Sequence, residues 1–298
     1  MTIPHGTILG GVITTPDLDA ALADYAGTLG LAIVERGALS HDLAASWGCP
    51  ASASSAMAVL QPSSGAPCFV RLVEQAVPAD FRPTRTYGWA AYEFSVQHVY
   101  GWPDRLAGSG FDIVGPPKEI AGLPYFIPMQ VTGRGREMLY LNEVRENTPS
   151  SDLPKAASPV DKIFICILAT PDLPGAVDWY KRTLGLDEGG TYTIEYTMLN
   201  KAFALPDGTQ HSLTMVQAGR TPIAEVDAYP AAATVRTHPL GTLPPGNALV
   251  TLAVDSLDRA GLDWIVPPAV RDGALYGGHR AGTVRGPAGE LLELVEVG

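Results

Sequence analysis

The chain has 298 residues, of which 46% are hydrophobic and 17% charged, so it can bury a large core and is too apolar for a disordered protein. Its net charge of −11 disfavours nucleic acid and anionic membrane surfaces as partners, because both repel an acidic body. No apolar run is long enough to span a bilayer, and three cysteines without a CxxC spacing indicate a cytoplasmic location rather than a disulfide framework.

A repeat opens each half of the chain. Residues 15–31 read TPDLDAALADYAGTLGL and residues 170–186 read TPDLPGAVDWYKRTLGL, so 10 of 17 positions agree without a gap. Residues 131–144 and 284–297 form a weaker pair that closes each half. The chain therefore consists of two related halves.

Between the halves lies a polar, proline-marked stretch, Glu146–Pro159, which is typical of a linker. We therefore expect an N-terminal domain over 1–146, a linker over 147–159 and a C-terminal domain over 160–298.

The predicted elements of each half follow one order. The first half has a helix in its repeat, a helical insertion near Ser40–Trp47, and strands at Phe69–Val73 and Tyr92–Val99. In the second half, Asp172 caps a helix that Gly185 ends. The expected strands there are 163–168, 191–199, 202–205 and 212–217, with a turn at 206–208, then 248–254, 282–284 and 291–295, and a short helix at 257–264. The order strand, helix and three strands occurs four times.

Four βαβββ modules in two halves, with the closing motif GPAGELLEL at 286–294, resemble the vicinal oxygen chelate superfamily of glyoxalases, bleomycin-resistance proteins and extradiol dioxygenases. The resemblance runs from about Thr7 to Val297. It implies an α+β fold in which the modules pair into two glyoxalase-like domains, and curved mixed sheets form open cups around a ligand. We expect the two modules of each half to pair.

The resemblance also implies positions for metal ligands on the first and last strand of each module. The residues at these eight positions are Gly10, Arg71, Ala91, Tyr140, Ile165, Thr214, Leu249 and Glu293. Glu293 alone keeps a family ligand, and three protein ligands are usual for a catalytic transition metal. We therefore expect no cofactor, with divalent Fe, Mn, Zn or Ni as the alternative.

Glu293 is the first candidate catalytic residue. The alternation of Glu293 with Leu292 and Leu294 predicts that it points into the cup, where desolvation would raise its pKa and suit it to general acid–base catalysis. His279 precedes the neighbouring strand and is the second candidate. The alternative is a buried glutamate paired with a cation, such as Arg280 or Arg285.

Four further residues are candidates for substrate binding, namely Tyr276, Tyr196, Arg71 and Tyr140. An inward arginine could bind a carboxylate or enolate oxygen, and an inward tyrosine could donate a proton. Many aromatics elsewhere favour a flat or aromatic small-molecule ligand. A structural ion pair of Arg71, for example with Glu93, is the alternative for that residue.

Three functions fit these residues. The first is a metal-independent lyase or isomerase that acts on an aromatic or oxygenated metabolite by proton transfer. The second is a metal-dependent extradiol-type ring-cleavage dioxygenase. The third is a non-catalytic protein that binds and sequesters a planar compound, as bleomycin-resistance proteins do. We favour the first, with its site in the second half and the protein a monomer or homodimer.

Overall fold

The computed structural model describes residues 3–120, 122–259 and 261–298. Its strands are β1 (Ile8–Thr15), β2 (Ala32–Ala38), β3 (Ala56–Gln61), β4 (Phe69–Glu74), β5 (Gly88–Val96), β6 (Asp112–Gly115), β7 (Phe126–Thr132), β8 (Met138–Val144), β9 (Val160–Thr170), β10 (Asp187–Glu195), β11 (Gln210–Ala218), β12 (Thr221–Ala228), β13 (Asn247–Val254), β14 (Ala269–Val270), β15 (Arg280–Arg285) and β16 (Leu291–Glu296). Its α-helices are α1 (Leu18–Leu22), α2 (His41–Ser46), α3 (Trp102–Leu106), α4 (Leu173–Leu184) and α5 (Thr197–Phe203).

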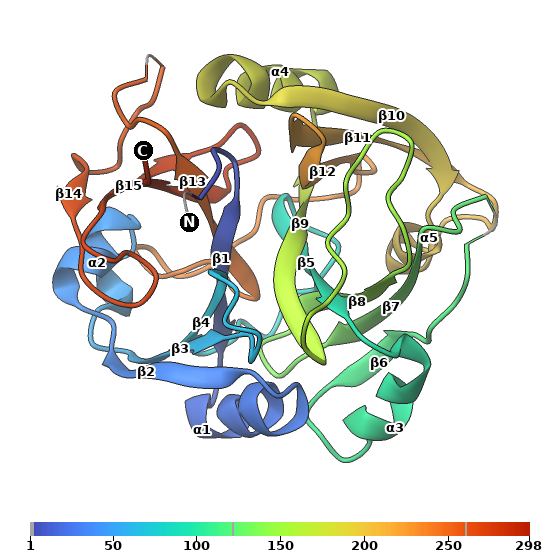
Figure 1. The fold of residues 1–298 in the computed structure, drawn as a ribbon, viewed down its shortest axis with the longest axis horizontal. Helices are drawn as coiled ribbons and strands as arrows, with labels where there is room; N and C mark the ends of the chain where they lie inside the picture. The colour runs from blue at the N-terminus through green and yellow to red at the C-terminus, as the bar shows by residue number, and fades with distance from the viewer. Residues whose placement is uncertain (1–2, 121, 260) are drawn as a thin grey trace.

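The strands form two eight-stranded sheets. Sheet I has the order β14-β15-β16-β13-β1-β4-β3-β2, and sheet II has the order β10-β11-β12-β9-β5-β8-β7-β6. Each sheet is mixed, because first and last strands of a module pair in parallel while the others pair in antiparallel fashion. The two sheets curve away from each other on the left and right of Figure 1, as the expected α+β fold with two cups requires.

The sheets do not follow the two sequence halves. Sheet I joins the first module to the fourth through the antiparallel pair β1–β13, and sheet II joins the second module to the third through β5–β9. The expected domains at 1–146 and 160–298 are thus corrected, since each structural unit takes one module from each half. The physical reason is that the first strand of each module has an edge that can pair with any of the other first strands. The local sequence of a strand does not specify which of them it pairs with.

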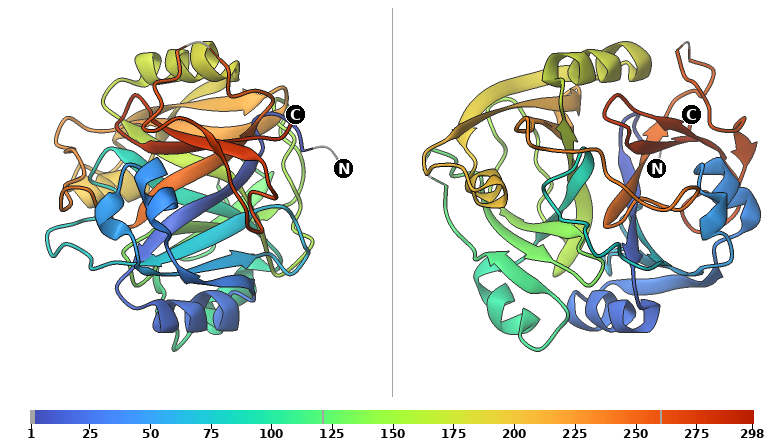
Figure 2. Two further views of the ribbon diagram at one scale, coloured as in Figure 1. Left: turned by 90° about the vertical axis from the view of Figure 1, so that its left-hand side faces the viewer. Right: turned by 180° about the vertical axis from the view of Figure 1, so that it is seen from behind.

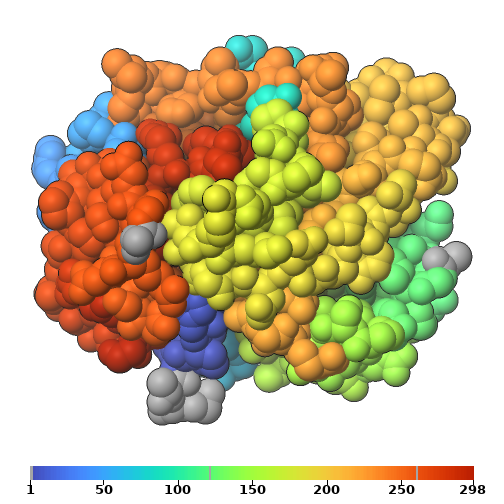
Figure 3. All heavy atoms as spheres, turned by 90° about the horizontal axis from the view of Figure 1, so that it is seen from above, coloured from blue at the N-terminus to red at the C-terminus, as the bar shows by residue number. Residues whose placement is uncertain are grey.

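The main core lies between the sheets. Tyr92 of β5 crosses this core, and its hydroxyl donates to the backbone carbonyls of Val12 at 3.0 Å and Leu249 at 2.8 Å. Gly11 makes room for that ring, because a Cβ there would lie 2.6 Å from it. The indole of Trp89 donates across the same boundary to the carbonyl of Leu291 at 2.8 Å. These contacts join the sheets into one body, which Figure 3 shows from above as a continuous surface.

The repeated sequence motifs form two equivalent hydrogen bonds. The Tyr25 hydroxyl, on the short π-helix Ala23–Thr28, donates to Glu137 at 2.7 Å, and the Tyr180 hydroxyl of α4 donates to Glu290 at 2.8 Å. Each bond ties the helix that opens a half to the turn before the strand that closes it. Each half thus stays linked although its modules lie in different sheets.

Local predictions are confirmed where caps define them. The carboxylate of Asp172 accepts from the Gly175 amide at 3.1 Å at the start of α4, and Gly185 follows its last residue with a φ of 70°. The predicted insertion near Ser40–Trp47 contains α2, which Ser40 caps at 3.1 Å.

Two local predictions in the second half are wrong. The segment 202–205, expected as a strand, mostly lies in and directly after α5, and the described residues of 257–264 contain no helix. The last strand of the third module is therefore β12, which the sequence analysis did not identify. The shift matters for the site, because it moves the implied ligand position from Thr214 on β11 to β12.

The segment 147–159, which we expected to be a linker, contains neither helix nor strand. It nevertheless packs against sheet II, since Leu153 is buried beside Phe164 and Ile165. The three cysteines are free and buried. In the part of the chain that the structure describes, no helix has both the length and the apolarity that crossing a membrane requires.

Candidate functional site

Glu293 lies at the centre of β16 on the concave face of sheet I, which we name cup I. Its side chain is 0% exposed. One carboxylate oxygen accepts from the Trp47 indole and the Tyr276 hydroxyl, each at 2.8 Å. The other accepts from the Arg71 guanidinium and the Thr251 hydroxyl, again at 2.8 Å. Each oxygen of the Glu293 carboxylate therefore already accepts hydrogen bonds from two donors of the protein itself.

Arg71 completes this network from β4. Its side chain is 1% exposed and also donates to the hydroxyls of Tyr276, at 2.8 Å, and Thr251. Its guanidinium carbon lies 4.9 Å from the ring centroid of Trp47 and 5.9 Å from that of Tyr276, within the range of cation–π attraction. Arg71 and Glu293 thus form a buried ion pair. The sequence alternatives expected a pair of this kind but named other partners, Glu93 for Arg71 and Arg280 or Arg285 for Glu293.

Cup I is closed by the insertion after β2. The helix α2 places Trp47 at its C-terminal cap, 0% exposed, directly on Glu293. On the other side Tyr276, 6% exposed, precedes β15. Both rings contact the ion pair. The helix α2, blue in Figure 2, lies beside the red C-terminal strands.

The electrostatics of Glu293 differ from those expected. Burial by itself would raise the pKa of this carboxyl, but Arg71 and the donors Trp47, Thr251 and Tyr276 outweigh it, and the pKa is lowered. The prediction of a raised pKa at Glu293 is therefore wrong. A carboxylate held ionised by four donors is a poor proton acceptor near neutral pH.

The second catalytic candidate lies apart from Glu293. His279 is exposed in the loop before β15, and the four groups that bind Glu293 do not include it. Arg280 pairs with Glu296 at 3.2 Å and with Asp258 at 3.6 Å, so it is not the partner of Glu293.

The other two binding candidates meet on the concave face of sheet II, which we name cup II. Tyr140 lies on β8 and Tyr196 precedes α5, and their hydroxyls are 2.9 Å apart. Tyr196 also donates to Glu225 of β12 at 3.5 Å. The short helix α5 is inserted between β10 and β11 (Figure 1). Tyr196, the residue before it, thus comes from the third module to a strand of the second.

Cup II also contains three acidic side chains, which we call the carboxyl cluster: Glu93 on β5, and Glu225 and Asp227 on β12. Glu225 and Asp227 share a face because alternate residues of a strand point the same way. Glu93 and Asp227 are 5% and 1% exposed, whereas Glu225 is partly exposed. Among the described residues, no lysine, arginine or histidine forms an ion pair with any of the three.

The pKa shifts in cup II run opposite to that of Glu293. Burial raises the pKa of Glu225 to about 7, while hydrogen bonds with Asp227 and Tyr196 limit the rise. Burial and the neighbouring Glu225 raise the pKa of both Glu93 and Asp227 well above their usual values. These directions indicate that Asp227 shares a proton with Glu225.

The tyrosines of cup II remain protonated. Burial raises the pKa of Tyr140 and Tyr196, and the nearby carboxyl groups raise that of Tyr196 further. Cup II therefore combines an acid–base group that titrates near neutrality with hydroxyl donors beside it.

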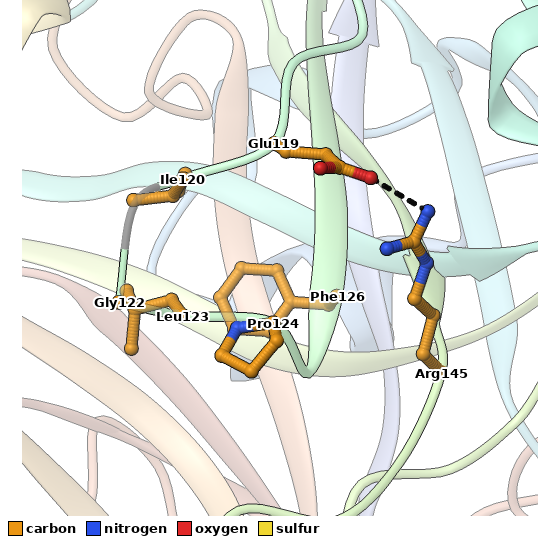
Figure 4. A pocket seen from close by; sticks show the side chains of 7 residues that line it. All are labelled: Glu119, Ile120, Gly122, Leu123, Pro124, Phe126 and Arg145. Atoms are coloured by element: carbon orange, nitrogen blue, oxygen red, sulfur yellow. Dashed lines mark ion pairs between the residues drawn. The ribbon is translucent and has the colours of Figure 1, made fainter.

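A cavity of about 550 Å³ opens at one end of cup II, between the loop before β7 and the end of β8. Figure 4 shows the rings of Phe126 and Pro124 below an ion pair of Glu119 and Arg145, which is 2.9 Å long. Phe126 packs against the apolar cluster that includes Ile165 and Met215. Since Met215 lies opposite Glu225 in the sheet, this cluster connects the cavity with the middle of cup II.

The positions that the superfamily uses for a metal do not fit one here. In cup I the carboxylate of Glu293 already holds the guanidinium of Arg71. In cup II the four equivalent positions are Ala91, Tyr140, Ile165 and Glu225, of which two have no side-chain lone pair. No group of three or more His, Cys, Asp or Glu within the described ranges is arranged to hold a metal ion.

Sequence reasoning missed the acidic residues of cup II and the role of Trp47. A signal for Glu225 was present, because Ala224 and Val226 flank it as Leu292 and Leu294 flank Glu293. It was overlooked because the strand assigned to this position was β11, on which Thr214 bonds with Thr191 at 2.9 Å.

Comparisons with known proteins agree with this architecture. Residues 162–294 match the family model of the Glyoxalase/Bleomycin resistance protein/Dioxygenase superfamily. No curated protein sequence matches the chain.

Solved structures share the fold over almost the whole chain. Glyoxalase I from Zea mays superposes with a TM-score of 0.61 at 14% identity, over 97% of this chain and 92% of that one. A putative dioxygenase from Bacillus subtilis gives 0.63 at 11% identity, over 98% and 86% of the two chains. Residues 162–294, somewhat less than half of the chain, are therefore similar to the glyoxalase/bleomycin resistance protein/dioxygenase superfamily, and almost the whole chain shares the fold of these solved structures.

Proposed function

We propose that the protein is a small-molecule enzyme, a lyase or isomerase, that transfers a proton in cup II with Glu225 as its general base. The observation that carries this proposal is the position of Glu225, whose partly exposed carboxyl lies beside the hydroxyls of Tyr196 and Tyr140 on the concave face of sheet II. Burial also raises the pKa of Glu225 to about 7. A base with a pKa near the working pH combines a sufficient ionised fraction with useful basicity. Glu293 takes the role of a structural residue in this proposal.

The chemistry follows from the two kinds of group. The Glu225 carboxylate removes a proton from a carbon next to a substrate carbonyl, and the electron pair moves onto the carbonyl oxygen. When substrate binds, the Tyr196 hydroxyl turns its one hydrogen from Glu225 to that oxygen, and the Tyr140 hydroxyl donates to Tyr196. The proton then returns to a neighbouring carbon in an isomerase, or a leaving group departs in a lyase.

Solvent exchange tests this proposal without knowledge of the substrate. The protein would be incubated in D2O with a panel of aryl ketones and α-hydroxy ketones, and loss of C–H signals would be followed by proton NMR. Glu225→Gln should lower the exchange rate by about 10²–10⁴-fold. Glu188→Gln is the matched control, since Glu188 is exposed on β10 of the same sheet and pairs with Lys181.

Exchange that persists in Glu225→Gln would overturn the assignment of the base. Exchange that disappears after chelation and returns with Fe, Mn, Zn or Ni would support the metal-dependent dioxygenase or glyoxalase chemistry instead. Saturable binding of panel compounds without any exchange would support a sequestering protein.

A further inference from the structure

The two cups differ in which charged residues they have at equivalent strand positions. The last strands of sheet I place Arg71 and Glu293 opposite Val12 and Thr251 of the first strands. In sheet II the same register places Tyr140 opposite Glu93, and Glu225 opposite Ile167. Cup I thus contains a carboxylate and a guanidinium at these positions, whereas cup II contains carboxyl groups and no cation.

Cup II has hydrogen-bond acceptors that the protein leaves unsatisfied. Apart from the proton that it shares with Glu225, the Asp227 carboxyl receives no donor, and neither does the side-chain oxygen of Asn142, within the described part of the chain. Both residues are 1% exposed. Asn142 faces the same cup, because its amide nitrogen donates to Glu93. Buried acceptors without donors are costly, so this arrangement favours a ligand that brings donors.

The surroundings suit a cation rather than a neutral donor. In cup I the guanidinium of Arg71 lies between a carboxylate and two aromatic rings. Cup II offers the same two kinds of group, namely the carboxyl cluster and the rings of Tyr140, Tyr196 and Tyr229, which pack in one apolar cluster. Arg71 therefore shows what kind of group such a cup accommodates.

We infer that cup II binds an organic cation, an ammonium or amidinium group on an apolar body, with the charge between Asp227, Glu225 and Glu93. The apolar body would extend along Met215 and Phe126 toward the cavity beside Glu119 and Arg145. The inference rests on the proposed function only in placing the substrate in cup II, and it does not require Glu225 to transfer a proton.

Calorimetric titration with five matched probes tests the inference: benzamidine, benzylamine, benzamide, benzyl alcohol and benzoate. We expect benzamidine and benzylamine to bind saturably at one site, at least tenfold more tightly than the two neutral probes, and benzoate to bind more weakly still. Asp227→Asn should weaken benzamidine at least tenfold, which is about 1.4 kcal/mol. Asp207→Asn, at an exposed turn, removes the same charge and should leave the affinity unchanged.

Equal affinity for benzamidine and benzamide, no change in Asp227→Asn, or no saturable binding of either cation would each overturn the inference. Tighter binding of Mg²⁺ or Mn²⁺ that displaces benzamidine would also overturn it, in favour of an inorganic cation. The thermal midpoint of Asp227→Asn shows whether the variant is folded. If Asp227→Asn weakens cation binding while Glu225→Gln leaves the rate of solvent exchange unchanged, this inference stands and the proposed function is overturned.

Discussion

Cup I and cup II have the same strand order and opposite interiors. In cup I the carboxylate of Glu293 is neutralised by Arg71 and sealed under Trp47, and its pKa is lowered. In cup II the carboxyl of Glu225 has no internal cation and is partly exposed, and its pKa rises to about 7. The comparison teaches that one scaffold can lower or raise the pKa of a glutamate at the same strand position, depending on whether the facing strand supplies an arginine.

The largest expected effect comes from breaking the ion pair of cup I. Arg71→Met leaves the Glu293 carboxylate buried without its cation, which costs about 3–5 kcal/mol of unfolding free energy. Chemical denaturation would measure it. The double variant Arg71→Met/Glu293→Leu should recover most of the loss, while Arg280→Met, at a half-exposed pair, should change stability by less than about 1 kcal/mol. A mild effect of Arg71→Met would contradict the view that cup I is a sealed structural unit.

A smaller effect is expected at the bonds that tie each half together. Tyr25→Phe and Tyr180→Phe each remove a hydroxyl donor from a buried glutamate, at a cost of about 2 kcal/mol. The two losses should be similar, because the bonds are equivalent in the two halves. Thermal unfolding of both variants measures this, and a loss at one site alone would show that the halves are not equivalent in stability.

The pH dependence of stability should distinguish the cups. Because the folded pKa of Glu225 is raised, its contribution to stability is present below about pH 4.5 and is lost as the pH rises to about 7. Glu293, whose pKa is lowered, stabilises the fold above its unfolded pKa and loses this effect as the pH falls.

Glu225→Gln tests that sign. We expect the variant to be more stable than the parent by up to about 3 kcal/mol at pH 8 and equally stable at pH 4. Glu93 and Asp227 face the same group and should titrate together with it, whereas Tyr140 and Tyr196, whose pKa values are raised, stay protonated. The denaturant midpoints of the variant and the parent would be compared at both pH values. A variant less stable than the parent at pH 8 would show that neighbouring groups stabilise the Glu225 carboxylate.

The smallest effect is expected at His279. This side chain is exposed in a loop beside cup I, so His279→Ala should change the unfolding free energy by less than about 0.5 kcal/mol. Its solvent-exchange activity should equal that of the parent, as measured in the NMR assay. A loss of solvent-exchange activity in His279→Ala would instead indicate that the catalytic site lies in cup I.

The sequence by itself determined the local elements and the repeat. Asp172 and Gly185 define the ends of α4, and the alternation around Glu293 predicts a strand with an inward carboxylate, because capping and strand periodicity depend on neighbouring residues. The family resemblance then supplied the α+β fold and the two cups. The sequence also indicated Tyr140 and Tyr196 as candidate binding residues, but it did not indicate that their hydroxyls lie in contact.

The tertiary structure alone decided which modules pair, and with that the chemistry of each cup. Arg71 meets Glu293 across 222 positions of sequence, and Tyr140 meets the strand of Glu225, because the first strands pair between halves rather than within them. Four similar modules have similar free edges, so the choice between pairings rests on long-range contacts such as those of Tyr92 in the central core. The position of a carboxyl in the chain is local information, whereas its pKa depends on what other strands bring to it.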